Sequence, residues 1–206
     1  MTKVKICGLS RMADIEAVNR HIPDFAGFVF AKSRRQVDAD TASKLISALN
    51  HNIRSVGVFV NSPVEDILKT ARLAGLDIIQ LHGDEDAGYI SNLRKHWDKE
   101  IWKAIRVSDS ISEKTLFKLP ADRFLLDAFS PGVYGGTGQT FDWNAINISY
   151  TDRVIIAGGI NHSNAANAVK RFSPYCIDIS SGAETDGFKD EEKIKQCINN
   201  IREVQS

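Results

Sequence analysis

The sequence predicts an α/β protein, a single (β/α)8 TIM barrel that spans residues 1–206. Short β-branched runs alternate with helical patterns along the chain, which is typical of a parallel sheet covered by helices. The predicted strands begin roughly every 21 to 30 residues, about the length of one strand plus one helix. They are nearly continuous apolar runs, as expected of strands that are buried on both faces.

Eight segments are the candidate strands, because each is rich in β-branched or aromatic residues. In chain order they are 4–7, 25–30, 55–60, 78–81, 101–105, 124–127, 154–157 and 176–179. Eight strand–helix units without an extra segment favour a closed barrel over an open doubly wound sheet. The open sheet would usually carry a Gly-x-Gly-x-x-Gly turn after its first strand, where this chain has Cys7-Gly8-Leu9-Ser10.

Helical patterns lie between the strands. The predicted helices are 13–18, 42–49, 64–74, 165–171 and a last one with Ile194, Cys197, Ile198 and Ile201 on one face. Ser10 is the expected N-cap of the first helix, and Asn161 or Ser163 that of the fourth. Pro63 stands near the start of the third, where a first-turn proline is tolerated.

The composition excludes several classes of protein. The 26 basic and 26 acidic side chains balance without long runs of like charge, which argues against a nucleic-acid partner. The apolar segments are too short for a membrane helix, and the N-terminus lacks a secretory signal, so we expect neither a membrane partner nor export. Cys7, Cys176 and Cys197 suit a reducing cytoplasm better than a disulfide framework. The cysteine and histidine spacings contain no structural zinc motif, and we expect no metal.

Two neighbouring strands end in small residues, which predicts a phosphate site. Strand 176–179 is followed by Ser180-Ser181-Gly182, and strand 154–157 by Gly158-Gly159. Free backbone N–H groups in such turns bind anions, and glycine lets a phosphate approach closely. In a (β/α)8 barrel, the loops after strands seven and eight are the common phosphate site.

Candidate catalytic residues stand at the predicted carboxyl ends of strands, where barrel enzymes place their chemistry. Cys7 ends the first strand, and a thiolate can act as a base, although most unpaired cysteines are small buried hydrophobes. Asp127 ends the sixth strand, and it is either an acid or a cap for the glycine-rich loop 131–138, a candidate lid. His82 is either a proton carrier or a hydrogen-bonded strand-end residue. Arg34 and Arg35 are candidates for binding a carboxylate, or solvated surface residues.

These residues belong to a series of motifs that resembles the phosphoribosylanthranilate isomerase family of tryptophan biosynthesis. The motifs are Lys5-Ile-Cys-Gly-Leu, Gly27-Phe-Val-Phe, Val56-Gly-Val-Phe-Val-Asn61, Gln80-Leu-His-Gly83, Asp127, Gly135-Gly-Thr-Gly138, Phe141-Asp-Trp143, Ala157-Gly-Gly-Ile160, Asp178-Ile-Ser-Ser-Gly182 and Lys189-Asp190. Each motif alone is weak, but their shared order from residue 3 to about residue 195 is highly specific.

The resemblance implies a cofactor-free and metal-free Amadori rearrangement of N-(5-phospho-β-D-ribosyl)anthranilate to 1-(2-carboxyphenylamino)-1-deoxy-D-ribulose 5-phosphate. By resemblance, Asp127 is the general acid that opens the ribose ring, and Cys7 is the general base that removes the proton from C2. Arg35 is expected to hold the anthranilate carboxylate. The other expected substrate contacts are His82, Gly136, Gly158, Gly159, Asp178, Ser180, Ser181 and Gly182. The partner is a small phosphorylated substrate, and the protein is a monomer or a homodimer.

Two departures from the family pattern leave questions open. Arg34 stands where the family often has proline, so the choice between Arg34 and Arg35 is unsettled. Asp186-Gly187 replaces a common Pro-Gly before the last helix. Two alternatives are a histidine-pathway aminoaldose isomerase, which uses an aspartate where this chain has Cys7, and a non-catalytic barrel that binds a phosphorylated ligand. Neither the group that lowers the Cys7 pKa nor a side activity on the histidine-pathway substrate follows from the sequence.

Overall fold

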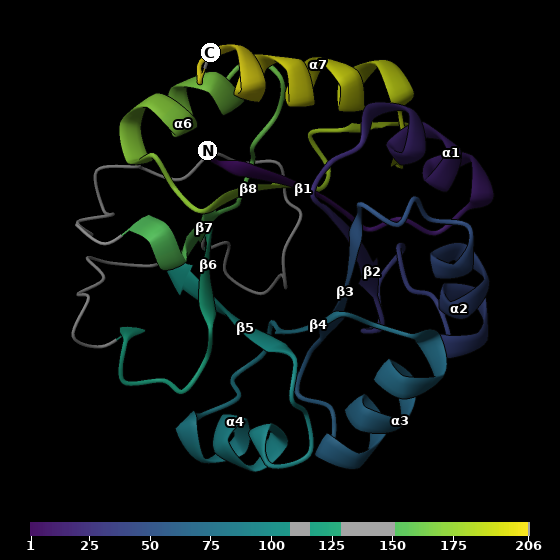
Figure 1. The fold of residues 1–206 in the computed structure, drawn as a ribbon, viewed down its shortest axis with the longest axis vertical. Helices are drawn as coiled ribbons and strands as arrows, with labels where there is room; N and C mark the ends of the chain where they lie inside the picture. The colour runs from purple at the N-terminus through teal and green to yellow at the C-terminus, as the bar shows by residue number, and fades with distance from the viewer. Residues whose placement is uncertain (108–115, 129–150, 206) are drawn as a thin grey trace.

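The computed structural model describes residues 1–107, 116–128 and 151–205. Eight parallel strands close into a barrel in the order of the chain (Figure 1). They are β1 (Lys3–Cys7), β2 (Phe25–Val29), β3 (Arg54–Phe59), β4 (Ile78–Leu81), β5 (Glu100–Val107), β6 (Arg123–Ala128), β7 (Val154–Ile156) and β8 (Cys176–Ile179). The predicted barrel is therefore confirmed, and all eight predicted strands are present, two of them with the predicted bounds.

The barrel closes where β1 pairs with β8, with Lys3 opposite Cys176 and Ile6 opposite Ile179. Alternate strand residues point into the barrel or toward the helices, so the structure has two apolar layers. The inner layer contains Phe25, Val56, Ile78, Trp102, Ala104, Leu125, Ile155, Ala157 and Cys176. The outer layer packs the other strand faces against the helices. This double burial explains the near-continuous apolar runs of the strand sequences.

Helices cover the outside of the barrel (Figure 1). They are α1 (Met12–His21), α2 (Ala39–Ser47), α3 (Val64–Ala74), α4 (Ala87–Arg94), α6 (Ala165–Phe172) and α7 (Glu191–Glu203), with a short 3₁₀ helix η2 (Thr151–Arg153) before β7. The sequence patterns predicted five of the six α-helices in the described part of the chain and missed α4. That helix is short, contains Gly88 and buries only Ile90 and Leu93, so its sequence has little helical periodicity.

Two predicted helix caps are wrong. The N-cap of α1 is Arg11 in place of Ser10, because the helix begins at Met12. The Asp14 carboxylate accepts hydrogen bonds from the backbone N–H groups of both Ser10 and Arg11, at 2.9 and 3.0 Å. The N-cap of α6 is Asn164. Asn161 stabilises the preceding turn instead, since its Oδ1 accepts from the backbone N–H of Ser163 at 2.9 Å.

A small antiparallel hairpin between β8 and α7 was not predicted. Strand β9 (Glu184–Thr185) pairs with β10 (Phe188–Lys189). The two residues between them, Asp186 and Gly187, have φ values of 51° and 84°. Positive φ at both central positions defines a type I′ turn, for which Asp-Gly is a preferred dipeptide. The Asp186-Gly187 departure thus marks the turn of this hairpin.

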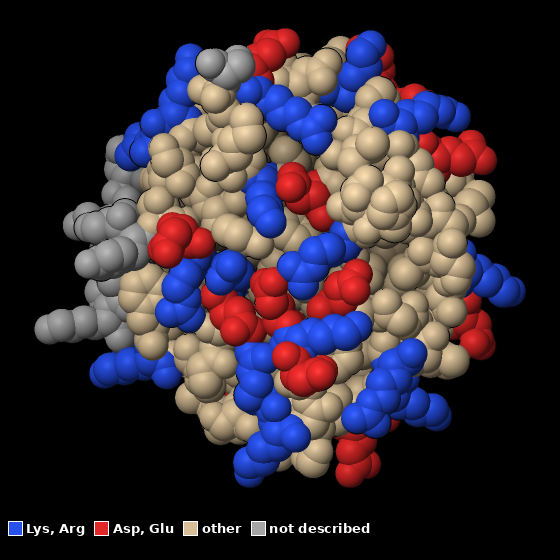
Figure 2. Space-filling model, in the orientation of Figure 1, with Lys and Arg blue, Asp and Glu red and all other residues tan. Residues whose placement is uncertain are grey.

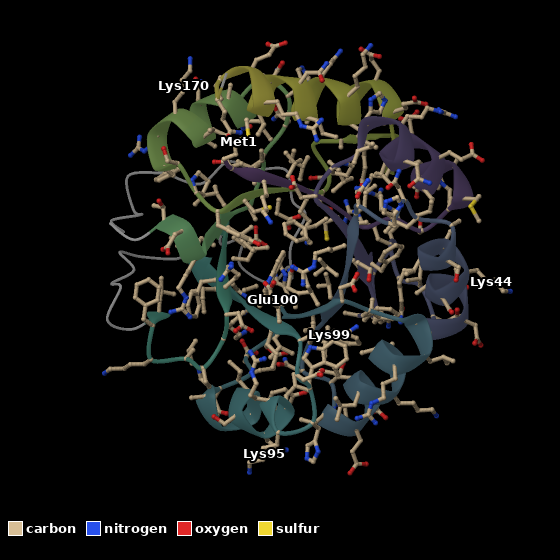
Figure 3. The ribbon with its side chains drawn as sticks, in the orientation of Figure 1. Met1, Lys44, Lys95, Lys99, Glu100 and Lys170 are labelled. Atoms are coloured by element: carbon tan, nitrogen blue, oxygen red, sulfur yellow. The ribbon has the colours of Figure 1, made fainter. Side chains whose placement is uncertain are left out.

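Charged side chains of both signs are interspersed over the face seen in Figure 2, in keeping with the zero net charge. In Figure 3 the labelled Lys44, Lys95 and Lys170 lie on the outer rim, whereas Glu100, the first residue of β5, lies over the barrel in this view. Glu100 accepts hydrogen bonds from Arg54 at 2.7 Å and from the Trp102 indole at 2.9 Å. Within the described ranges, we find no helix with the length and apolarity to cross a bilayer.

Candidate active site

A cavity of about 460 Å³ opens at the carboxyl ends of the strands, the end at which barrel enzymes bind substrates. Its walls include most of the residues expected at the site. These are Cys7, Arg35, His82, Asp127, Gly158, Gly159, Asp178, Ser180 and Ser181. Apolar side chains of β2 and β3 and the loops after them, among them Phe30 and Val58, complete the wall. The barrel therefore gathers side chains that are far apart in the sequence around one space.

Cys7 is the last residue of β1, and it is buried. Gly27 of β2 lies beside it, where a Cβ would be 2.8 Å from the Cys7 Sγ. Burial raises the pKa of the Cys7 thiol above its ordinary value, and the charge of Lys5 opposes that rise without cancelling it. The other two cysteines are also buried, but neither lines the cavity. Cys7 is thus the thiol placed to reach a substrate.

Below Cys7, an ion pair lies inside the barrel between neighbouring strands. Lys5 Nζ of β1 is 3.0 Å from Asp178 Oδ1 of β8, and Lys5 has no exposed surface. Burial alone would lower the pKa of Lys5, but Asp178 and Cys7 outweigh burial and raise it. Lys5 is therefore a fixed positive charge next to Cys7. Sequence reasoning missed it, although it stands in the first motif two residues before Cys7.

Asp127 lies on β6 and contacts His82, which follows β4. His82 Nε2 and Asp127 Oδ2 are 3.1 Å apart, and the Gln80 amide nitrogen is 3.1 Å from His82 Nδ1. All three side chains line the cavity. The oxygen of the Gln80 amide is buried without a hydrogen-bond partner among the described residues. His82, expected as a substrate contact, is thus also placed to exchange a proton with Asp127.

The loop that carries His82 is held by a buried ion pair. Lys103 Nζ donates to the carbonyl of Gly83 at 2.7 Å and to Glu85 at 3.0 Å. Glu85 in turn accepts from the backbone N–H groups of Gly83 and Asn61, at 2.9 and 2.8 Å. These bonds join the loops after β3 and β4, so the loop that carries His82 is fixed to its neighbour.

The two predicted phosphate turns touch each other. Asn161 and Gly182 form a backbone bridge, and a Cβ on Gly182 would lie only 1.9 Å from the carbonyl oxygen of Ile160. Gly158 and Gly159 have φ values of 82° and 66°, a region that favours glycine. Gly182 is therefore needed for the close approach of the two loops. This contact brings the turns after β7 and β8 to one side of the cavity.

The structure distinguishes the two arginines after β2. Arg35 lines the cavity with a side chain that is 16% exposed, whereas the Arg34 side chain is 64% exposed. The Arg35 side chain crosses Gly8, where a Cβ would lie 2.4 Å from Arg35 Cδ. Both guanidinium groups contact Glu184 of the unpredicted hairpin. The placement favours Arg35 as the residue that faces a ligand.

Part of the expected site lies outside the described residues. This applies to Gly136, to the rest of the glycine-rich loop 131–138, and to the motif 141–143. Within the residues that the structure does describe, no three His, Cys, Asp or Glu side chains are grouped so that they could hold a metal ion.

Comparisons with known proteins agree with the motifs. A family model described as N-(5'-phosphoribosyl)anthranilate (PRA) isomerase matches residues 4–200. A relative named N-(5'-phosphoribosyl)anthranilate isomerase, from Acetivibrio thermocellus, is 47% identical, and the match covers 99% of this chain and 97% of the relative.

Solved structures show the same similarity. Phosphoribosyl anthranilate isomerase from Thermotoga maritima has a TM-score of 0.87 and 32% identity, over 98% of this chain and 100% of that one. Another isomerase of this name was solved in complex with reduced 1-(o-carboxyphenylamino)-1-deoxyribulose 5-phosphate. It has a TM-score of 0.82 and 29% identity over the same shares of the two chains.

Proposed function

The chain belongs to the N-(5'-phosphoribosyl)anthranilate isomerase family, and from this premise we propose how its own residues perform the family's reaction. The protein is an aldose–ketose isomerase of tryptophan biosynthesis, and its substrate is N-(5-phospho-β-D-ribosyl)anthranilate. One observation carries the assignment of roles. Cys7 and Asp127 line one cavity, together with Arg35 and the glycine turns after β7 and β8.

Substrate binding uses the two anionic ends of the molecule. The phosphate occupies the turns at Gly158-Gly159 and Ser180-Ser181, whose small residues leave backbone N–H groups accessible to an anion. The anthranilate carboxylate pairs with Arg35, whose planar guanidinium matches a carboxylate in a bidentate fashion. Binding both ends holds the ribose between them, so the non-reacting phosphate contributes binding energy to the chemistry.

The first chemical step opens the ribose ring. Asp127 donates a proton to the ring oxygen, and the nitrogen lone pair forms a protonated imine at C1. The acid must carry a proton when the substrate arrives. His82 supplies a route, because its Nε2 is 3.1 Å from Asp127 Oδ2, within hydrogen-bond distance for a proton carried on that nitrogen. Gln80 supports either form of the ring, since its amide donates from Nε2 or, turned by half a rotation, accepts at Oε1.

The second step removes the proton from C2. The positive iminium makes this proton acidic, and Cys7 accepts it, giving an enolamine that tautomerises to the ketone. In the free protein burial favours the neutral thiol, as the raised pKa of Cys7 shows. Two positive charges then favour the thiolate, namely the fixed charge of Lys5 and the iminium of the substrate. The base thus becomes competent when the substrate is bound.

The proposal is tested by the fluorescence assay for loss of phosphoribosylanthranilate. Cys7→Ala and Asp127→Asn should each lower kcat by at least about a hundredfold, since a positioned acid or base contributes 10²–10⁴-fold. Matched controls are Cys197→Ala, on the buried face of α7, and Asp152→Asn, in the exposed η2 helix. Both controls should keep wild-type turnover. Turnover close to wild type in either site variant, in protein with an unchanged unfolding temperature, would refute its role.

A further inference from the structure

The carboxylate of Glu184 is the meeting point of three cationic side chains. Arg35 binds it in a bidentate fashion, with Nε 2.6 Å from Oε1 and Nη2 2.9 Å from Oε2. Arg34 Nη2 adds a contact at 3.0 Å, and Lys189 Nζ one at 2.7 Å. Burial alone would raise the pKa of Glu184, but the bonds and charges of Arg35 and Lys189 outweigh burial and lower it. Glu184 is therefore ionised at neutral pH, although its side chain is only 5% exposed.

This contact leaves part of the Arg35 guanidinium for a ligand. A guanidinium carries five N–H bonds, and Glu184 takes the edge formed by Nε and Nη2. The other edge, formed by Nη1 and Nη2, has the fork geometry that matches a second carboxylate. Because the side chain also crosses Gly8, it is held on one side by backbone and on another by Glu184. Few orientations of the fork remain.

The hairpin of Glu184 also contacts the candidate phosphate turn. Lys189 Nζ donates to the carbonyl of Ser180 at 2.9 Å. Arg34 packs against Gly187, where a Cβ would lie 2.4 Å from Arg34 Nη1. Glu184 thus links the arginine loop after β2 to the turn after β8. These are the two places where we expect the anionic ends of the substrate to bind.

We propose that Glu184 is a positioning residue that aims Arg35 at the anthranilate carboxylate. The inference rests on the proposed function, because it assumes that Arg35 binds that group. Loss of the Glu184 charge has two effects of opposite sign. A more positive site attracts any anion more strongly, whereas a misaligned fork binds the carboxylate specifically less well. The inference requires the second effect to dominate, so the sign of the change is diagnostic.

The experiment compares two ligands that differ only in the ring carboxylate. They are reduced 1-(o-carboxyphenylamino)-1-deoxyribulose 5-phosphate and the corresponding phenylamino compound. In wild type the first should bind at least about tenfold more tightly, the scale of one charge-assisted contact. Glu184→Gln should lower this ratio by about tenfold, with the affinity for the phenylamino compound kept within about threefold. In turnover, KM should rise about tenfold while kcat stays within about threefold, the pattern of lost binding.

Further variants distinguish a loss of Arg35 orientation from misfolding and from a general change of charge. Glu184→Asp keeps the charge but shortens the side chain, so the ratio should fall less than in Glu184→Gln. Glu192→Gln removes the same charge from an exposed position on α7 and should change the affinity for neither ligand. The inference is overturned if Glu184→Gln binds both ligands more tightly than wild type, or if it binds both more weakly by the same factor. It is also overturned if Glu184→Gln leaves the ratio of the two affinities unchanged while Arg35→Ala abolishes the preference for the carboxylated ligand. That result would leave the proposed function intact. A ratio that survives Arg35→Ala would overturn the role of Arg35 as well.

Discussion

Removal of Lys5 should destabilise this barrel far more than removal of a surface lysine. Lys5 is completely buried, and its ammonium is 3.0 Å from the Asp178 carboxylate, which is 8% exposed. Lys5→Met keeps the aliphatic part of the side chain and leaves Asp178 as an unpaired buried charge. Breaking a buried pair in this way costs about 3–5 kcal/mol. Since a domain of this size is stable by about 5–15 kcal/mol, the variant should remain folded but lose a large part of its stability.

The measurement is urea unfolding followed by circular dichroism, with thermal unfolding as a second reading. The midpoint in urea should fall at an unchanged slope, and the unfolding temperature should fall by about 6–20 °C for a chain of this length. Lys195→Met is the matched control, because Lys195 is about half exposed and pairs with Glu192 on the surface of α7. It should cost less than about 1 kcal/mol.

The double variant tests the reasoning. Lys5→Met with Asp178→Leu removes both charges and fills the space with apolar atoms, so most of the lost stability should return. If Lys5→Met costs less than about 1 kcal/mol, or if the double variant is no more stable than the single one, the buried pair is not what the stability depends on.

Three further predictions concern the site. Alkylation of Cys7 by iodoacetamide, followed by peptide mass spectrometry, should still be accelerating at pH 9, because burial raises the pKa of the thiol and only the thiolate reacts; a plateau reached below pH 8 would contradict the burial argument. His82→Asn should lower kcat by about tenfold or more with little change in KM, because it removes the proton route to Asp127; an unchanged kcat would leave His82 as a structural residue. Gly182→Ala should raise KM and cost about 1–3 kcal/mol of stability, because its Cβ would meet the carbonyl of Ile160 at 1.9 Å. The control Gly88→Ala in α4, whose Cβ has space, should neither raise KM nor lower the stability.

Secondary structure was predicted best from the sequence where all residues of an element are buried. Strands β4 and β8 are apolar apart from Gln80 and Asp178, and each is followed at once by a polar residue, so their bounds were predicted correctly. The helix α4 and the hairpin β9–β10 have few buried residues, and apolar periodicity could not reveal them. The cap of α1 was wrong because Ser10 and Arg11 both precede the same helical pattern, which does not specify that the first helical residue is Met12.

The sequence by itself determined the barrel, the family and nine of the residues that line the cavity. These follow from the repeat of strands and helices and from the order of short motifs, both of which are properties of the linear chain. Only the tertiary structure decided which side chains act on one another. The partners of Arg35 and His82, Glu184 and Asp127, are separated from them by 149 and 45 residues along the chain. Closure of the barrel brings these residues within hydrogen-bond distance, and spacing along a sequence carries no record of that contact. The same closure pairs Lys5 with Asp178 and so fixes a positive charge beside Cys7, which opposes without cancelling the rise of the Cys7 pKa caused by burial.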